Sequence, residues 1–273
     1  MAMKNLAQRF LVALVAVPIL LFVIYQASPH PTWFFVCLLA MLSMHEFFSM
    51  GPCNKRQALL STMVGGLAVA GFYWLPTEFA FQMTSIGVVG FFGLYYLFGY
   101  KDMSQSASRC TSSISGVFYA GCMTVFIAIV RRDALDGADM VILLLMTAWL
   151  SDTGGYFAGK SIGGKKLYPS VSPNKTWAGS IGGIATVALG AAAFKFFRMP
   201  DLSWPLLWVL VIPGTILGQM GDLFESLLKR SYAVKDSGAL LPGHGGLLDR
   251  VDAVLFIAPY FYLVLKLAVV FQK

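Results

Sequence analysis

Long apolar stretches alternate with short polar segments along the whole of this 273-residue chain. Each stretch is roughly 16 to 20 residues long, close to what a helix needs to cross about 30 Å of hydrocarbon. Because a backbone in lipid must satisfy its own hydrogen bonds, these stretches are expected to be helices. We count nine of them, at residues 10–25, 32–50, 58–76, 83–98, 114–130, 139–158, 179–197, 203–221 and 252–271.

The composition agrees with this pattern. Apolar residues make up 58% of the chain and charged residues only 12%, with a mean hydropathy of +0.72, whereas soluble domains carry about 25% charged residues. We therefore expect an all-α polytopic membrane protein with about nine transmembrane helices. It forms one integral domain, with an N-terminal group of helices over residues 1–138 and a C-terminal group over residues 139–273 that carries the polar loops.

The distribution of basic residues predicts the orientation, because lysine and arginine are enriched in cytoplasmic loops. Placing the N-terminus inside and the C-terminus outside puts 14 of the 20 basic residues on the cytoplasmic side. The same bias accounts for the net charge of +7, so no nucleic-acid partner is expected. The six basic residues on the outer side are Arg131, Arg132, Lys195, Arg198, Lys266 and Lys273.

This orientation brings two polar loops, about 159–178 and 222–251, to the cytoplasmic face of the cell (inner) membrane. Together they hold eight of the 20 basic residues, which makes this face the predicted location of an active site.

The second polar loop begins with DLFESLLKRS, in which Asp222, Ser226, Lys229 and Arg230 share one helical face. A carboxylate can hold Mg²⁺, which proteins bind through one or two carboxylates plus substrate phosphates. Lysine and arginine can neutralise those phosphates. The alternative is an amphipathic helix at the membrane surface, whose Lys229 and Arg230 contact lipid headgroups.

Glycine and proline dominate the next segment, from Lys235 and Asp236 to Gly245 and Gly246, so it is predicted to be a tight loop whose backbone can approach a ligand. Backbone N–H groups in such a loop can bind phosphate. His244 lies in this loop, although a single loop histidine more often serves as a tether.

Asp249 and Asp252 open the last apolar stretch, with Arg250 between them. Capping is one interpretation, since carboxylates are favoured at a helix N-terminus. The other is a metal site that Asp249 shares with Asp222, because a single loop joins their two helices. So many carboxylates are also compatible with a second cation beside Mg²⁺.

The first polar loop, SDTGGYFAGKSIGGKKLYPSVSPNKTW, has a similar composition, with Asp152 at its start and Lys175 in a predicted Ser-Pro-Asn-Lys-Thr turn. It is interpreted as a second phosphate-binding segment, the alternative being a positively charged loop with ordinary turns. Gly179 and Gly183 form a GxxxG pattern that favours helix packing.

His45 and Glu46 stand near the end of the second apolar stretch. Ionisable residues in apolar surroundings are functional candidates by default. The simpler expectation for Glu46 is an ion pair with Lys55 or Arg56 at the membrane surface.

From Ser226 to Asp252 the chain reads SLLKR, then KDSG, then LPGHGGLLDRVD. This run resembles, without a gap, the signature of the phosphatidate cytidylyltransferases, the CDP-diacylglycerol synthases. SDTGGYFAGK and SPNKTW resemble further blocks of that family. Two positions depart from it, because Asn174 replaces a lysine and Ala178 stands where glutamate is usual.

The resemblance implies that CTP and phosphatidic acid react to give CDP-diacylglycerol and pyrophosphate, with Mg²⁺ required. In this interpretation Asp222 and Asp249 hold the metal. The expected phosphate and substrate ligands are Ser226, Lys229, Arg230, Lys235, Arg250, Gly245 and Gly246, with Asp152, Lys175, Asp236, His244 and Asp252 as second choices. The sequence leaves open whether the protein acts as a homodimer.

Two other functions fit parts of the pattern. A CTP-dependent kinase of polyprenols or phytol would use the same kind of substrates but transfer the γ-phosphoryl group. A secondary transporter or ion channel would also have many spans, but it would place charges near the bilayer midplane in repeated halves. Here the charges gather at one face and no repeat is detectable.

Overall fold

The computed structural model describes residues 14–99, 102–238 and 245–271. An apolar helix, Leu14–Ile24, comes first. It is followed by α2 (His30–Met50), α3 (Lys55–Trp74), α4 (Thr77–Gly99), α5 (Met103–Gly116), the π-helix η1 (Val117–Cys122), α6 (Met123–Asp133), α7 (Gly137–Ser161), β1 (Lys166–Tyr168), β2 (Ser172–Thr176), α8 (Trp177–Arg198), α9 (Trp204–Ser231) and α10 (Leu248–Phe271).

Seven helices in the described ranges are long and apolar enough to cross a bilayer, which confirms a polytopic helical membrane protein. They are α2, α4, the continuous helix from α5 through η1 to α6, α7, α8, α9 and α10. Seven of the nine expected spans thus correspond to helices of this kind in the described residues. The first helix spans only Leu14–Ile24 in the described residues, and α3 is not among the seven although it has 20 residues. The orientation stays a prediction.

The chain forms two compact units. The first takes in the chain up to Ile129 together with Val234–Arg250, and the second takes in Val130–Ala233 and the chain from Val251 onward. Helix α10 therefore begins in the first unit and continues in the second. The division expected at residue 138 stays a prediction.

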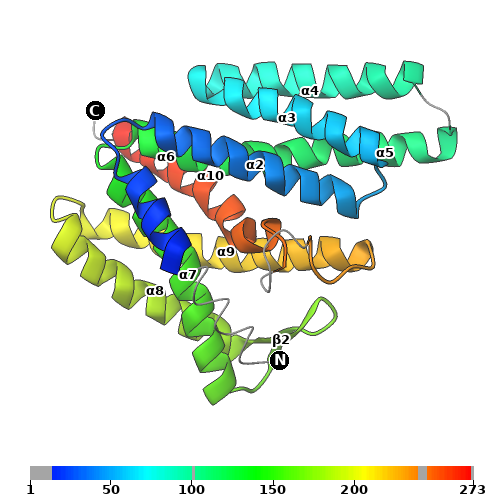
Figure 1. The fold of residues 1–273 in the computed structure, drawn as a ribbon. Helices are drawn as coiled ribbons and strands as arrows, with labels where there is room; N and C mark the ends of the chain where they lie inside the picture. Colours follow the sequence, from blue (N-terminus) through cyan, green and yellow to red (C-terminus); the bar gives the residue numbers. More distant parts are fainter. Residues whose placement is uncertain (1–13, 100–101, 239–244, 272–273) are drawn as a thin grey trace. The chain divides into compact units, whose positions relative to one another are not determined.

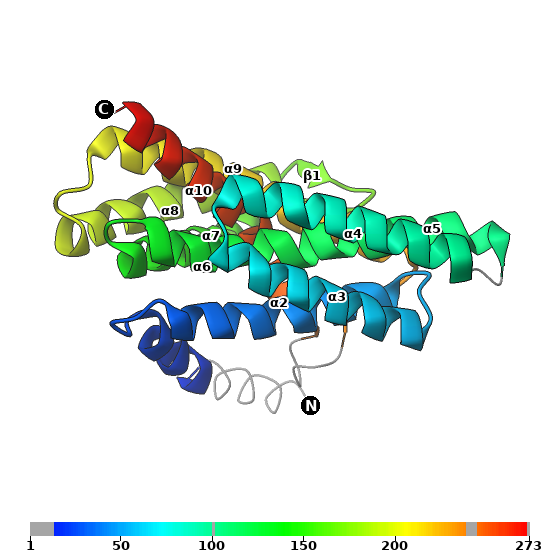
Figure 2. The same ribbon diagram turned by 90° about the horizontal axis from the view of Figure 1, so that it is seen from above.

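In the first unit, α2 and α3 lie side by side (Figure 2). Their packing with η1 depends on glycines. A Cβ added at Gly65 would lie 2.5 Å from the Met44 sulfur, and one at Gly116 would lie 2.2 Å from the Phe48 ring. Helix α2 is therefore closely covered where it carries Glu46.

The span expected at 114–130 begins about three turns earlier, because α5 starts at Met103. Asp102 caps its N-terminus by accepting a hydrogen bond from the Ser104 N–H at 3.0 Å. A hydrogen bond from the Ser104 hydroxyl, together with this one from the Ser104 N–H, lowers the pKa of Asp102. Six serines keep α5 polar, so apolar character alone could not reveal that the helix extends through it.

Helices α7 and α8 of the second unit pack closely along their length (Figure 1). A Cβ added at Gly179 would lie 2.8 Å from the Gly155 carbonyl oxygen, and one at Gly183 would lie 2.8 Å from the Ser151 carbonyl oxygen. The predicted packing role of the GxxxG pattern is thereby confirmed.

Gly182→Ala should test this interface most severely. Its Cβ would lie 2.2 Å from the Cβ of Ala158, so the two backbones must separate. We expect the free energy of unfolding to fall by about 1 to 3 kcal/mol, measured by unfolding in detergent. Gly87→Ala is the control, because nothing lies within 4 Å of that position; equal stability of the two variants would contradict the packing account.

The segment after α7 differs from the predicted turn. Ser172–Thr176 forms strand β2, which pairs antiparallel with β1 and places Lys166 opposite Thr176 and Tyr168 opposite Ser172. Gly163 and Gly164 have φ of 66° and 89°, a conformation that favours glycine, and they let the chain turn from α7 into the hairpin. The otherwise helical fold thus includes a two-stranded sheet that directs Lys175 toward the second unit's cavity.

Candidate functional site

A cavity of about 470 Å³ opens in the second unit, between α7, the hairpin, α8 and α9. Its size falls in the usual range for a small-molecule site. Glycines line much of one wall, which leaves room next to the backbone. The lining residues are Ser151, Asp152, Gly155, Tyr156, Gly159, Lys160, Leu167, Asn174, Lys175, Thr176, Gly179, Ser180, Gln219 and Asp222.

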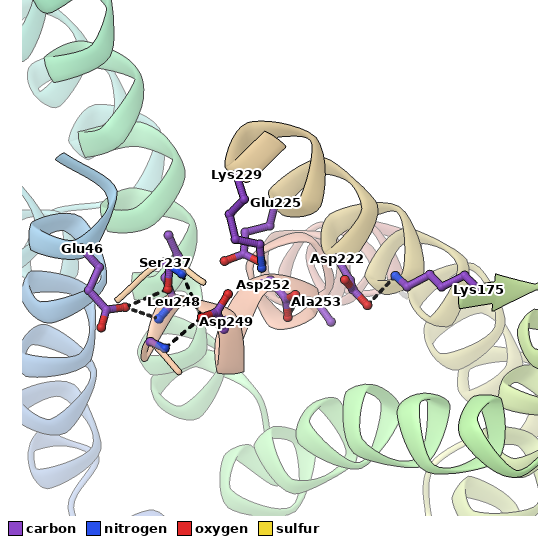
Figure 3. Close-up of polar contacts among 11 residues, drawn as sticks. Glu46, Lys175, Asp222, Glu225, Lys229, Ser237, Leu248, Asp249, Asp252 and Ala253 are labelled. Carbon is purple, nitrogen blue, oxygen red and sulfur yellow. Dashed lines mark hydrogen bonds and ion pairs between the residues drawn. The ribbon is translucent and has the colours of Figure 1, made fainter. Parts of the chain in front are cut away.

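Lys175 and Asp222 form an ion pair in this cavity (Figure 3). Their side chains are only 27% and 29% exposed, so each charge is partly removed from water. Strand β2 supplies the cation and α9 the carboxylate, although 47 positions separate them in the sequence. An incoming anion could bind Lys175, and a metal cation could bind Asp222, by displacing one partner of the pair.

Gln219 links three helices at the same cavity. Its side-chain oxygen accepts a hydrogen bond from the Ser180 hydroxyl at 2.5 Å. Its amide nitrogen donates to the Ser151 hydroxyl at 3.3 Å and to the Ser180 carbonyl at 3.1 Å. Because Gln219 lies one turn before Asp222 on α9, these bonds fix the part of α9 that presents the carboxylate.

A second ion pair lies further along α9. Lys229 Nζ donates to Glu225 Oε2 at 2.5 Å, and both side chains are buried (Figure 3). The spacing of four residues places them one turn apart on the same side of the helix. The sequence predicts that Lys229 binds phosphate. The structure places it beside a buried carboxylate, and its contact with phosphate stays a prediction.

Asp252 of α10 also lies near this part of α9 in the second unit. A Cβ added at Gly221 would lie 2.7 Å from the Asp252 carbonyl oxygen. The Asp252 carboxyl is close enough to Asp222, Glu225 and Asp152 for their charges to interact. Although the described residues contain no preformed group of three metal-binding side chains, Mg²⁺ in nucleotide sites commonly takes one or two carboxylates and completes its shell with phosphate and water. The carboxylates present here suit that ion.

In the first unit, Asp249 closes the loop that precedes α10. Its Oδ2 accepts hydrogen bonds from the Ser237 N–H at 3.0 Å and the Gly246 N–H at 2.8 Å (Figure 3). Gly245 has a φ of 77°, so a side chain there would be strained. The two glycines thus serve the turn that brings the backbone to Asp249.

Glu46 binds the same loop, and the expected ion pair with Lys55 or Arg56 is wrong. Its Oε2 accepts from the Leu248 N–H at 2.8 Å and from the Ser237 hydroxyl at 3.1 Å (Figure 3). The side chain is buried, whereas both cations begin α3 and are exposed. Its partners are therefore a loop hydroxyl and the first N–H of α10 instead of the surface cations, and they bond Oε2, while the buried Oε1 has no hydrogen-bond partner among the described residues.

The predicted site residues therefore fall into three groups. Asp152, Lys175 and Asp222 line one cavity. Gly245 and Gly246 lie in the loop of the first unit and Asp249 lies in the first turn of α10, while Lys235, Asp236 and Arg250 of the same unit are exposed. Ser226, Lys229 and Arg230 follow Asp222 on α9, where Ser226 is half-buried and Arg230 exposed, and Asp252 lies on α10. His244 lies outside the described residues. The predicted pairing of Asp222 with Asp249, which belong to different units, stays a prediction.

Three residues near these groups, Gln219, Glu46 and Glu225, are not among the predicted site residues. The contacts of Gln219 depend on the fold, and the sequence carries no local signal for it. Glu46 is marked in the sequence as an ionisable residue in apolar surroundings, but its partners depend on the fold. Glu225 could have been found, because its spacing of four from Lys229 is the spacing of helical ion pairs.

Comparison with known proteins decides the family. Residues 7–268 match the sequence profile of the cytidylyltransferase family. The chain belongs to the cytidylyltransferase family. It is 30% identical to a phosphatidate cytidylyltransferase of Bacillus subtilis, over 97% of this chain and 99% of the relative. It is 33% identical to the Staphylococcus aureus enzyme of that name, over 85% and 88% of the two chains. It is 42% identical to the Brucella suis one over 55% of each.

Family membership gives meaning to one departure noted in the sequence. Asn174, which stands where a lysine is common in the signature, lines the cavity beside Lys175. This cytidylyltransferase therefore has one cation fewer on that wall than the resemblance suggests, and Lys175 and Lys160 are the lysines that line it.

Proposed function

We propose that this cytidylyltransferase transfers the cytidylyl group of CTP to phosphatidic acid, giving CDP-diacylglycerol and pyrophosphate in phospholipid biosynthesis. The observation that carries the proposal is the cavity in which Lys175 is paired with Asp222, in a chain of this family whose relatives bear the name of that activity. An anion site and a carboxylate in one cavity match the needs of a nucleoside triphosphate with its metal.

In the proposed reaction an oxygen of the lipid phosphate attacks the α-phosphorus of CTP. The bond from that phosphorus to the bridging oxygen breaks, and pyrophosphate leaves with the electron pair. No covalent enzyme intermediate is needed. Because such transfers depend mainly on positioning and charge neutralisation, lysine and arginine side chains and polar backbone groups can supply what the protein must provide.

Asp222 and Asp249 are the proposed Mg²⁺ ligands, with Asp252, near Asp222's helix, as a further candidate. When bound, the ion would neutralise charge on the triphosphate. A second cation is compatible with the negative charge of Asp222, Glu225 and Asp152, each of which interacts electrostatically with Asp252. The proposal implies that a chelator abolishes turnover of the purified protein and that added Mg²⁺ restores it; undiminished turnover in excess chelator would contradict it.

The phosphates of CTP and of the lipid are proposed to bind the basic residues of the two polar segments. Lys175 serves inside the cavity, and the Gly245–Gly246 backbone, with His244, serves on the loop. Ser226 and Asp236 are proposed to orient substrate oxygens. The other proposed phosphate ligands are Lys229, Arg230, Lys235 and Arg250.

We further propose that the protein lies in the cell (inner) membrane with its N-terminus and this site on the cytoplasmic side. CTP is a cytoplasmic solute, and phosphatidic acid would enter sideways from the inner leaflet. Cysteine-labelling accessibility from the two sides of sealed vesicles tests the orientation. Whether the protein forms a homodimer can be tested by cross-linking in native membranes.

The reaction is tested by incubating purified protein with CTP, phosphatidic acid and Mg²⁺. We expect pyrophosphate release in equal amount to CDP-diacylglycerol. Release of CDP together with a newly phosphorylated polyprenol or phytol, and no reaction of phosphatidic acid, would instead identify a CTP-dependent lipid kinase.

A further inference from the structure

Glu46 of α2 is hydrogen-bonded to the segment that leads into α10, in the C-terminal half of the chain. Its Oε2 accepts a hydrogen bond from the Ser237 hydroxyl at 3.1 Å, 191 positions away in the chain, and another from the Leu248 N–H at 2.8 Å. Leu248 is the first residue of α10, and the first N–H groups of a helix have no partner within it. A carboxylate there is also favoured by the helix dipole. Glu46, which lies on α2 and is 202 positions from Leu248 in the sequence, thus caps the N-terminus of α10.

Two glycines of the signature make room for this carboxylate. A Cβ at Gly238 would lie 2.5 Å from Glu46 Oε1, and a Cβ at Gly246 would lie 2.6 Å from Glu46 Oε2. Real Cβ atoms do not approach an oxygen so closely, so any larger residue would push the carboxylate and the loop apart. Glycine at 238 and 246 therefore leaves the space that the Glu46 carboxylate occupies.

The same loop atoms connect Glu46 to Asp249. Ser237 donates its hydroxyl to Glu46 and its backbone N–H to Asp249, while Gly246 lies against Glu46 and donates its N–H to Asp249. The carboxylates of Glu46 and Asp249 therefore lie on either side of Ser237 and both bind it (Figure 3). A shift of Glu46 must be transmitted to Asp249 through Ser237 and through the start of α10.

We propose that Glu46 is a positioning residue for cytidylyl transfer, which holds the loop and the first turn of α10 so that the Asp249 carboxylate is fixed in its working position. The inference rests on the proposed function and on Asp249 as a metal ligand. Glu46 itself contacts no substrate. Its effect is on geometry, and misplacing a reacting group by about 1 Å can reduce a rate about 100-fold.

Glu46→Ala, which removes both hydrogen bonds, is expected to lower kcat about 100-fold. It should also raise the Mg²⁺ concentration for half-maximal rate by about 10-fold or more, as loss of a residue that orients a metal ligand does. Glu46→Gln keeps an oxygen that can accept both bonds and should recover most of the loss. The Mg²⁺ half-saturation point does not depend on the fraction of folded protein, so misfolding cannot imitate this result.

Ser43→Ala is the matched control. Ser43 is a buried polar residue of α2, one turn before Glu46, and its hydroxyl has no hydrogen-bond partner among the described residues. Its kinetics and Mg²⁺ dependence should equal those of the wild type. Ser237→Ala combined with Glu46→Ala should be little worse than Glu46→Ala alone, because both act on one contact.

The outcomes separate the inference from the function on which it rests. If the wild type forms no CDP-diacylglycerol, the proposed function fails. If it does, and Glu46→Ala has the kcat and the Mg²⁺ half-saturation of the wild type, the positioning role is wrong. A fall in kcat with unchanged Mg²⁺ half-saturation and full additivity with Ser237→Ala would also overturn it.

Discussion

Asp222→Asn is expected to lower the turnover of phosphatidic acid by about 1,000-fold. The substitution removes a negative charge that is proposed to hold Mg²⁺ and that pairs with Lys175 in the cavity. A metal that stabilises transition-state charge contributes several kcal/mol, and each 1.36 kcal/mol is about tenfold in rate, so a loss of about 4 kcal/mol gives this factor. Asparagine has nearly the same shape, so the cavity should persist.

The measurement is CDP-diacylglycerol formation by purified protein over a range of Mg²⁺ concentrations. Asp139→Asn is the control, because Asp139 is also paired with a cation, Arg198, in the same unit, but stands in the first turn of α7, 13 residues before Asp152. The control should keep turnover within about twofold of the wild type. Turnover within tenfold of the wild type by Asp222→Asn at saturating Mg²⁺ would remove Asp222 from the metal site.

Lys229→Met is expected to cost about 3 to 5 kcal/mol of stability, because removing one partner of a buried ion pair leaves the other charge buried without it. Glu225 is fully buried and accepts from Lys229 at 2.5 Å. A second substitution, Glu225→Gln, removes that charge and should restore most of the stability. The restored protein should still be inactive if Lys229 also binds phosphate.

Reversible unfolding in mixed detergent micelles measures the free energies of unfolding of the wild type, of Lys229→Met and of the variant that also carries Glu225→Gln. Lys166→Met, at an exposed position of β1, provides the control and should change stability by less than about 0.5 kcal/mol. An unchanged stability of Lys229→Met would mean that the pair contributes nothing. Full activity of the restored double variant would assign Lys229 to structure alone.

The helical membrane fold could be predicted from the sequence because apolar length is a local property. The spans expected at 139–158 and 179–197 correspond to α7 and α8, and the extension of the eighth span past Gly221 follows from the helical spacing of its polar residues. The polar start of α5 and the hairpin could not be predicted in this way. Serine-rich helix and short strands lack a clear periodic pattern, and their formation depends on neighbours distant in sequence.

The candidate site was predictable in its chemistry but not in its pairing. The sequence predicts Asp222 and Lys175 as separate site residues, and only the fold shows that they form one ion pair. Glu46 was expected to pair with nearby cations, because sequence suggests close neighbours, whereas its partners lie 191 and 202 positions away. These two contacts arise from tertiary structure and can be found only there, whereas the buried pair of Glu225 and Lys229 follows from local helical spacing.

The proposed reaction is defined by which phosphorus of CTP is attacked. Purified protein should be given phosphatidic acid and CTP labelled either at the α-phosphate or at the γ-phosphate, and the label in the extracted lipid should be measured. Attack at the α-phosphorus predicts that only the α-label enters the lipid, as CDP-diacylglycerol, while the γ-label leaves as pyrophosphate. Transfer of the γ-label into lipid, with the α-label remaining in CDP, would contradict the account.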